Sequence, residues 1–372
     1  MNDRPHSDPL RNVLLLQGGG ALGAYQLGVI EALLAGGKTP EWVVGTSIGA
    51  INGALLAGNQ PHRRLERLRS FWETVSHGMA RGDDPAAAGL IGLWQAWRTI
   101  VGGQPGFFFP RVGSYFPLGL RTDPGTASYY DVAPLRRTLE NLVDFDFLAH
   151  SPIRLSVGAV DVESGRMRYF DSRNERIGVD HILASGALPP AFPAVEIGEQ
   201  HFWDGGLYSN TPLEHVLGDR PRISSLCFLT TLWPTTGSAP DNLRDVLERA
   251  KDIQYGSRDE TLLQVESEVH KLRQAVSLLA GRLPQTLHDD ETRAAAALGC
   301  DSVFHVVRLE APHLPGEDQT KDIEFVPERV QKRRRAGRAD TEAALSGRGW
   351  IASAPPLQGL AIHNPRACSV VG

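Results

Sequence analysis

The sequence is poor in the residues that stabilise secreted and membrane proteins. Its 372 residues include 3 cysteines, which are widely separated and show no C-x-x-C spacing: Cys227, Cys300 and Cys368. An odd and scattered set argues against a disulfide framework or a zinc site and favours a reducing compartment. No segment approaches the about 18 apolar residues of a membrane span, and the polar N-terminus does not resemble a secretion signal. We expect a cytoplasmic protein, for which peripheral contact with membranes or lipid surfaces stays open.

An excess of charge of one sign is also lacking. The formal net charge is -5, so the overall electrostatics give no case for nucleic-acid binding. One basic run, QKRRRAGR at residues 331–338, stands apart; such runs are usually solvated helix faces, and a patch for anionic membranes or nucleic acid is the weaker interpretation. Apolar residues make up 41% of the chain, which is enough for a sizeable globular core. Nothing in the sequence indicates an oligomeric state.

Two strand–turn–helix units near the N-terminus predict the fold. Residues 12–17, NVLLLQ, have the pattern of a buried strand and run into three glycines, which are followed by apolar residues at helical spacing. The segment WVVGTSIGAINGALLAG repeats this order. Strands and helices that alternate with short connections predict a three-layer α/β/α fold with a mainly parallel central sheet. Functional sites in such sheets lie at the carboxyl ends of the strands, where both glycine turns fall.

The rest of the chain is less regular. Residues 153–170 predict a hairpin, and residues 80–130, rich in glycine, proline and aromatics, predict either a lid that lines an acyl pocket or an ordinary covering loop. We expect four parts in all: a flexible N-terminus at 1–11, a catalytic domain at 12–232, a mostly helical extension at 233–345 with a late strand near 302–309, and a flexible tail at 346–372.

Ser47 lies at the centre of a G-x-S-x-G motif, between Gly45 and Gly49. The strand before it and the helix of small residues after it are the context in which this motif exposes a nucleophile above a sheet. The helix that follows places its first N–H groups, including that of Ile48, beside a developing oxyanion. The sequence therefore predicts Ser47 as a nucleophile, whereas the plainer interpretation is a serine that starts a helix.

The glycines of the first turn allow two interpretations. Gly18, Gly20 and Gly23 satisfy G-x-G-x-x-G after a strand, the dinucleotide-binding fingerprint. The acidic residue that should end the next strand and bind a ribose is missing, and no G-K-[ST] follows to make a P-loop. We favour an oxyanion hole built from the backbone N–H groups of Gly18, Gly19 and Gly20. A turn that merely needs a positive φ explains one glycine but not three in a row.

Asp204-Gly205-Gly206 is a third motif, and alone it is a generic turn. Together, GGGALG, GTSIG and DGG in this order resemble the patatin-like phospholipase family. The string ILASGALPPAFPAVEIGEQHFWDGGLYSNTPL resembles the aspartate block of that family, and KDIEFVPERVQKRRRAGRADTEAAL resembles the C-terminal extension of a bacterial subgroup. The resemblance covers roughly residues 12–345.

The resemblance implies a role for each motif. Ser47 would attack an ester carbonyl and Asp204 would take its proton directly, while Gly18, Gly19, Gly20 and Ile48 would stabilise the oxyanion. Gln17 stands where the family often has an acidic residue, which should not abolish chemistry because the donors are main-chain groups. No metal or organic cofactor is implied, and the expected partner is a lipid or another acyl ester. The substrate alternatives are a storage polyester or a thioester.

Three alternatives stay open at this stage. An aspartate with a pKa near its usual ~3.9 is a poor base, so Asp204 should be desolvated; a Ser–His–Asp triad through His313 or His201 is the competing mechanism. A non-catalytic lipid-binding protein with the same fold is the second alternative. A nucleotide-binding oxidoreductase built on Gly18, Gly20 and Gly23 is the third.

Overall fold

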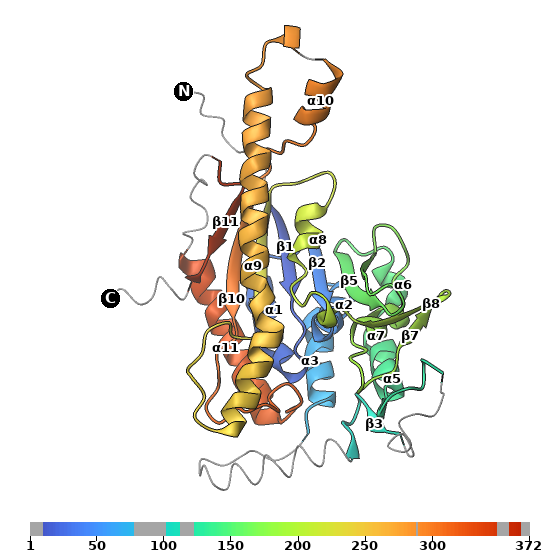
Figure 1. The fold of residues 1–372 in the computed structure, drawn as a ribbon. Coiled ribbons are helices and arrows are strands. Elements are labelled where there is room, and N and C mark those ends of the chain that lie inside the picture. Colours follow the sequence, from blue (N-terminus) through green and yellow to red (C-terminus); the bar gives the residue numbers. More distant parts are fainter. Residues whose placement is uncertain (1–9, 78–101, 112–122, 288, 348–356, 366–372) are drawn as a thin grey trace.

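The computed structural model describes residues 10–77, 102–111, 123–287, 289–347 and 357–365. Its centre is a sheet (Figure 1) whose strands are β1 (Arg11–Leu16), β2 (Trp42–Thr46), β5 (Arg154–Asp161), β6 (Met167–Asp171), β7 (Val195–Ile197), β8 (Gln200–Asp204), β9 (Ser225–Thr231), β10 (Phe304–Glu310) and β11 (Leu360–His363). The order is β11-β10-β9-β1-β2-β5-β8-β7, and β6 pairs with β5. The strands from β11 to β5 in this order are parallel, which confirms a mainly parallel sheet.

Alternate residues of β1 face two separate cores. Leu14 and Leu16 belong to one apolar cluster, and Val13 and Leu15 belong to the other. The first core packs beneath α1 (Ala24–Ala35), α2 (Ile48–Ala57), α3 (Arg64–Thr74) and α11 (Pro327–Gly347); the second packs beneath α8 (Leu213–Gly218) and α9 (Leu243–Ala280). Helices on both faces of the sheet confirm the expected three layers.

The remaining elements surround this framework. They are the short strands β3 (Phe109–Pro110) and β4 (Tyr130–Asp131), the helices α5 (Ala133–Leu142), α6 (Phe145–Leu148), α7 (Val179–Ser185) and α10 (Asp290–Ala296), and the 3-10 turns η1 (Gly20–Gly23), η2 (Gly205–Leu207) and η3 (Gln285–Leu287). The hairpin expected at 153–170 is the antiparallel pair β5–β6. Most of the segment 80–130, for which a lid was the open prediction, lies outside the described residues.

The C-terminal part of the chain is built into the same sheet. β10 pairs with β9, and β11 pairs with β10, both in parallel. Leu360–His363 form a strand within the segment that we expected to be a flexible tail, so the expectation is corrected for these residues. The strand is short and follows a proline-rich stretch, so its sequence alone does not indicate a strand. The extension therefore continues the central sheet as well as packing helices against it.

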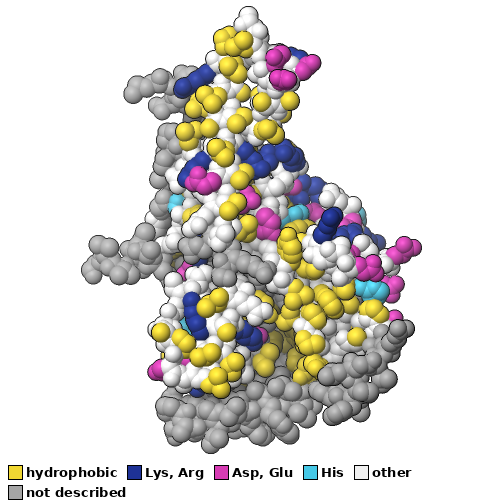
Figure 2. All heavy atoms as spheres, in the orientation of Figure 1, with side chains coloured by type: hydrophobic (Ala, Val, Ile, Leu, Met, Phe, Trp, Pro, Cys, Tyr) yellow, Lys and Arg dark blue, Asp and Glu magenta, His cyan; other side chains and the backbone are white. Residues whose placement is uncertain are grey.

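Helix α9 is much longer than the sheet that it covers. The far end of α9 and the attached α10 extend beyond the sheet in Figure 1, and apolar side chains gather on this projecting part in Figure 2. Leu272, Leu279 and Leu298 are exposed there. None of the described helices is long and apolar enough to cross a membrane.

Candidate active site

Ser47 is held in a sharp turn between β2 and α2. Its φ of 55° and ψ of −123° lie in a region that a non-glycine residue occupies at a cost of about 1–3 kcal/mol. The flanking glycines are needed because a Cβ at Gly45 would lie 2.4 Å from the carbonyl oxygen of Gly49, and one at Gly49 would lie 2.2 Å from that of Leu16. Strain of this kind at a serine that lines a cavity is typical of a nucleophile elbow.

The buried hydroxyl of Ser185 stabilises this turn. The N–H of Ser47 donates to Oγ of Ser185 at 3.0 Å, and Ser185 Oγ in turn donates to the carbonyl of Gly158 at 2.7 Å. Ser185 ends α7, so the elbow is tied to both α7 and β5. Sequence reasoning did not single out Ser185, because it lies in an ordinary helical stretch.

Strand β5 brings Ser47 and Asp204 together. Thr46 pairs with Gly158, and Asp204 pairs with Ala159, the next residue of β5. Since β6 pairs with the same two residues of β5, β2 and β8 must share the other edge, where their carboxyl ends meet. A Cβ at Gly205 would lie 2.6 Å from the carbonyl oxygen of Gly158, so this junction also needs a glycine.

The carboxyl of Asp204 is buried, with 3% of its surface exposed. It accepts a hydrogen bond from the N–H of Gly206 at 2.7 Å, and the side chain of Ser47 lies close enough to interact with it and lower its pKa. Burial raises the pKa of Asp204 from its usual 3.8 to about 6, against these two interactions, which lower it. An acid of this pKa is mostly ionised at neutral pH and is a much stronger base than a free aspartate.

The glycine turn after β1 faces the same point. Gly18 is fixed by Asn210, whose Oδ1 accepts its N–H at 3.0 Å and whose Nδ2 donates to its carbonyl at 3.1 Å. Trp233 Nε1 donates to the same carbonyl at 2.8 Å. Within the described residues the N–H groups of Gly19 and Gly20 have no acceptor. The N–H of Gly18 is already used by Asn210, so Gly19 and Gly20 are the glycines whose N–H groups remain available, and the predicted oxyanion hole stays a prediction.

Gln17 and Gly23 place this turn against the elbow. Gln17 is fully buried; its Nε2 donates to Thr211 Oγ1 at 2.6 Å and its Oε1 accepts from the N–H of Leu232 at 2.7 Å. A Cβ at Gly23 would lie 2.6 Å from Cγ1 of Ile48. Gln17 thus links the end of β1 to the segments around Thr211 and Leu232. This structural role fits the expectation that an oxyanion hole of main-chain N–H groups needs no acidic residue here.

A cavity of about 110 Å³ joins these groups. Ser47, Asp204, Ile48, Gly206 and the three glycines of the turn all line it. The other lining groups are mostly apolar or aromatic: Ile51, Phe107, Phe108, Leu135, Leu188, Phe192, Trp233, Tyr255, Ile323 and Phe325. A concave apolar site with a few polar groups at one place is the usual form of a small-molecule site.

The two histidines of the competing triad lie elsewhere. Among the described residues no histidine lines the cavity. His313 Nε2 lies 2.9 Å from Oε1 of Glu248, and this hydrogen bond raises the pKa of His313 above its usual value. His313 is thus engaged with a carboxylate of α9 and not with Ser47. In the described parts of the chain no group of three or more His, Cys, Asp or Glu side chains could hold a metal ion.

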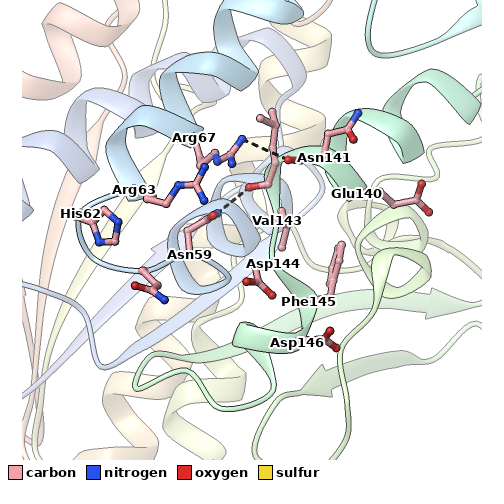
Figure 3. A pocket seen from close by; sticks show the side chains of 12 residues that line it. Asn59, His62, Arg63, Arg67, Glu140, Asn141, Val143, Asp144, Phe145 and Asp146 are labelled. Atoms are coloured by element: carbon pink, nitrogen blue, oxygen red, sulfur yellow. Dashed lines mark hydrogen bonds between the residues drawn. The ribbon is translucent and has the colours of Figure 1, made fainter.

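A second, larger cavity of about 570 Å³ lies between α2–α3 and α5–α6 (Figure 3). Its lining is strongly polar and includes Arg63, Arg67, Glu140, Asp144 and Asp146. Two of its carboxylates are already used: Asp144 Oδ1 accepts from the N–H of Phe147 at 2.8 Å, and Asp146 is paired with Arg176. Among the residues that the structure describes, the lining holds no serine, cysteine or threonine and thus no hydroxyl or thiol nucleophile of these types.

The basic run at 331–338 is part of α11 and is largely neutralised within the chain. Arg333 Nη2 lies 2.8 Å from Glu317, Arg334 Nη2 lies 2.7 Å from Glu31 of α1, and Arg338 Nε lies 2.8 Å from Glu342. Helices α1 and α11 pack so closely that a Cβ at Gly28 would lie 1.9 Å from the carbonyl oxygen of Arg334. Of these three arginines, Arg334 attaches α11 to α1, whereas Arg333 and Arg338 are paired within the extension itself.

Two family models match the chain. One, described as patatin-like phospholipase, matches residues 14–217, and another, described as patatin phospholipase, matches residues 253–357. A patatin-like phospholipase domain-containing protein of Aspergillus oryzae is 36% identical over 89 residues, which span 24% of this chain and only 12% of that protein. Among solved structures, VipD from Legionella pneumophila has a TM-score of 0.40 at 16% identity, covering 92% of this chain and 68% of its own. The type III effector ExoU has a TM-score of 0.35 at 15% identity, with 92% and 53% covered.

Proposed function

The chain belongs to the patatin-like phospholipase family, and from this premise we propose that it is a serine acyl hydrolase that cleaves lipid esters through Ser47 and Asp204. One observation carries the proposal: Ser47 and the buried carboxyl of Asp204 line the same apolar cavity, and Ser47 is close enough to lower the pKa of Asp204. A base within hydrogen-bond reach of a nucleophile is the arrangement that covalent catalysis needs.

Acylation follows from this pair and the turn beside it. Oγ of Ser47 attacks the ester carbonyl carbon while its proton moves to Asp204. The negative charge that develops on the carbonyl oxygen is stabilised by the N–H groups of Gly19 and Gly20, which have no acceptor within the described residues, and by that of Ile48 at the start of α2. As the tetrahedral intermediate collapses, the bond to the alcohol oxygen breaks and Asp204 returns the proton to it.

Deacylation uses the same residues in the reverse direction. A water molecule gives a proton to Asp204 and attacks the acyl carbon. The bond to Oγ of Ser47 then breaks, Oγ recovers the proton, and the carboxylic acid leaves. Since Asp204 accepts and returns one proton in each half, no third titrating residue is required.

The lining of the cavity supports an acyl group as the part of the substrate that is bound. Phe107, Phe108 and Phe192 form a contiguous group with ring centroids 5.4–6.2 Å apart, and Phe107 also contacts Phe325. Such a surface suits a hydrocarbon chain and offers little to a sugar or phosphate. The alternatives of a storage polyester or thioester share this acyl chemistry and differ in the leaving group.

The pH dependence of ester hydrolysis tests the proposed base. We expect hydrolysis of p-nitrophenyl butyrate or octanoate, with kcat/KM level above the pKa of Asp204, about 6, and falling about tenfold for each pH unit below it. The reason is that protonated Asp204 cannot accept the proton of Ser47. The release of p-nitrophenol is followed at its isosbestic wavelength, and His201→Ala serves as the control that should keep the same profile. The proposal would be contradicted if p-nitrophenyl esters of every acyl chain length stay intact, or if kcat/KM does not change between pH 5 and 8.

Gly20→Ala tests the oxyanion hole. Gly20 has a φ of +53°, and a Cβ there would lie 2.2 Å from the carbonyl oxygen of Asp322, so the turn must move. We expect kcat/KM for a p-nitrophenyl ester to fall about 100- to 1000-fold, the typical cost of one lost donor. Gly37→Ala is the matched control, because Gly37 has a φ of +70° but open space around it. Equal activity of the two variants would remove the glycine turn from the mechanism.

A further inference from the structure

A segment of the C-terminal extension lies directly on the glycine turn. We call residues 317–325, between β10 and α11, the strap. The carbonyl oxygen of Asp322 in the strap accepts the N–H of Ala21 at 2.7 Å. The same oxygen occupies the place where a Cβ of Gly20 would be. Asp322, Ile323 and Phe325 also line the cavity, so the strap forms part of its wall.

Buried charges hold the strap against α9. Lys321 is 2% exposed, and its Nζ lies 2.6 Å from Oδ1 of Asp252 and 3.1 Å from Oε1 of Glu248. From α11, Arg333 Nη2 donates to the carbonyl of Lys321 at 3.0 Å. A cation buried between two carboxylates permits few alternative positions, since any shift would leave charge unpaired in a dry environment.

The strap has a second attachment to α9, which is partly buried. Lys251 Nζ lies 2.6 Å from Oδ1 of Asp322 and donates to the carbonyl of Gln319 at 3.0 Å. Lys321, which precedes Asp322, and Lys251, which contacts the side chain of Asp322, thus both hold in place the carbonyl oxygen that accepts the Ala21 N–H. Because this bond takes the N–H of Ala21 out of the cavity, it also determines which N–H groups of the turn remain for substrate.

We propose that Lys321 is a positioning residue for the oxyanion hole, which it orients through the carbonyl of Asp322 and the N–H of Ala21. The proposal rests on the proposed acyl hydrolysis and extends the active site to the C-terminal extension. Lys321 touches no reacting atom; it acts by holding the strap, and the strap holds the turn that carries Gly19 and Gly20.

Lys321→Met in the full chain tests this role, with Lys332→Met as the matched control. Lys332 lies on α11 in an exposed pair with Glu328 at 2.6 Å and does not contact the strap. We expect Lys321→Met to lower kcat for a p-nitrophenyl ester by about tenfold or more with KM little changed, because the lost positioning acts on the transition state. Amide hydrogen exchange in the peptide that covers residues 17–24 should become faster in Lys321→Met and stay as in the wild type in Lys332→Met.

The two readouts separate this proposal from the proposed function. If the wild type hydrolyses no ester, acyl hydrolysis fails, while the exchange of the glycine turn still decides whether Lys321 orders it. If Lys321→Met does not fold, Lys251→Met, which removes the half-exposed attachment, takes its place with the same expected signs. A folded variant with wild-type kcat and unchanged exchange at residues 17–24 would overturn the proposal.

Discussion

Ser47→Ala should lower the rate of ester hydrolysis on the order of 10⁶-fold, the loss seen when serine hydrolases lose their nucleophile. The fold should be retained, since the hydroxyl projects into the cavity and the N–H that bonds Ser185 is unchanged. The measurement is kcat/KM for a p-nitrophenyl ester, with circular dichroism to establish folding. Alanine has a Cβ like serine, so the backbone strain of a residue at positive φ is the same in the variant, and the free energy of unfolding should change little.

Ser151→Ala is the matched control for the nucleophile. Ser151 is partly buried and its Oγ donates to the carbonyl of Ala57 at 2.7 Å, at the end of α2 away from the elbow. We expect this variant to lose some stability and to keep wild-type kcat/KM. Activity retained in Ser47→Ala, or lost equally in Ser151→Ala, would contradict the assignment of Ser47.

Asp204→Asn should abolish most activity and at the same time stabilise the protein. Without a base the rate should fall by about 10²- to 10⁴-fold. The pKa of Asp204 is raised from 3.8 to about 6 in the folded state, so its ionisation opposes folding as the pH rises through this window. At one pKa unit per 1.36 kcal/mol, ionisation costs about 3 kcal/mol at pH 7, which asparagine does not incur. The lost interaction with Ser47 reduces the gain, so we expect about 1–3 kcal/mol from urea unfolding.

The sign of this effect can be checked against a neighbouring carboxylate. Asp161, on β5, accepts from the N–H of Ser164 at 2.7 Å, and these backbone and side-chain bonds lower its pKa. Its ionised form therefore favours folding, and Asp161→Asn should destabilise the protein at pH 7 without loss of kcat. For Asp204→Asn the stability gain should disappear near pH 4, where Asp204 of the wild type is protonated in the folded state. A gain independent of pH would contradict a buried, ionised Asp204.

The parts of the fold that depend on local sequence could be predicted. Each of the two strand–turn–helix units is formed by contiguous residues. The glycines at 18–20 and at 45 and 49 mark the turns, because few other residues would fit there. The same local signal predicted Ser47 as the nucleophile, and the structure places Ser47 in the expected turn between β2 and α2. The alternation in β1, with Leu14 and Val13 facing different cores, likewise follows from period-two patterning in the chain itself.

The residues that complete the site are brought in from distant segments. Asp204 is placed by register with β5, and nothing near it in sequence distinguishes it from a turn aspartate, so its assignment relied on family resemblance. Asn210 acts through two hydrogen bonds to Gly18, and Asp322 acts through one hydrogen bond to Ala21; no sequence pattern indicates such contacts. The strand β11 was missed for a similar reason: four residues become a strand only because β10 offers a free edge.

The measurement that most directly tests the account is labelling with a fluorophosphonate, followed by peptide mass spectrometry. This reagent forms a covalent bond with an activated serine and places its phosphoryl oxygen where the oxyanion would lie. We predict a single adduct on Ser47 in the wild type, none in Ser47→Ala and greatly slowed labelling in Asp204→Asn. An unlabelled wild type, or an adduct that persists when Ser47 is replaced, would contradict a serine hydrolase built on Ser47 and Asp204.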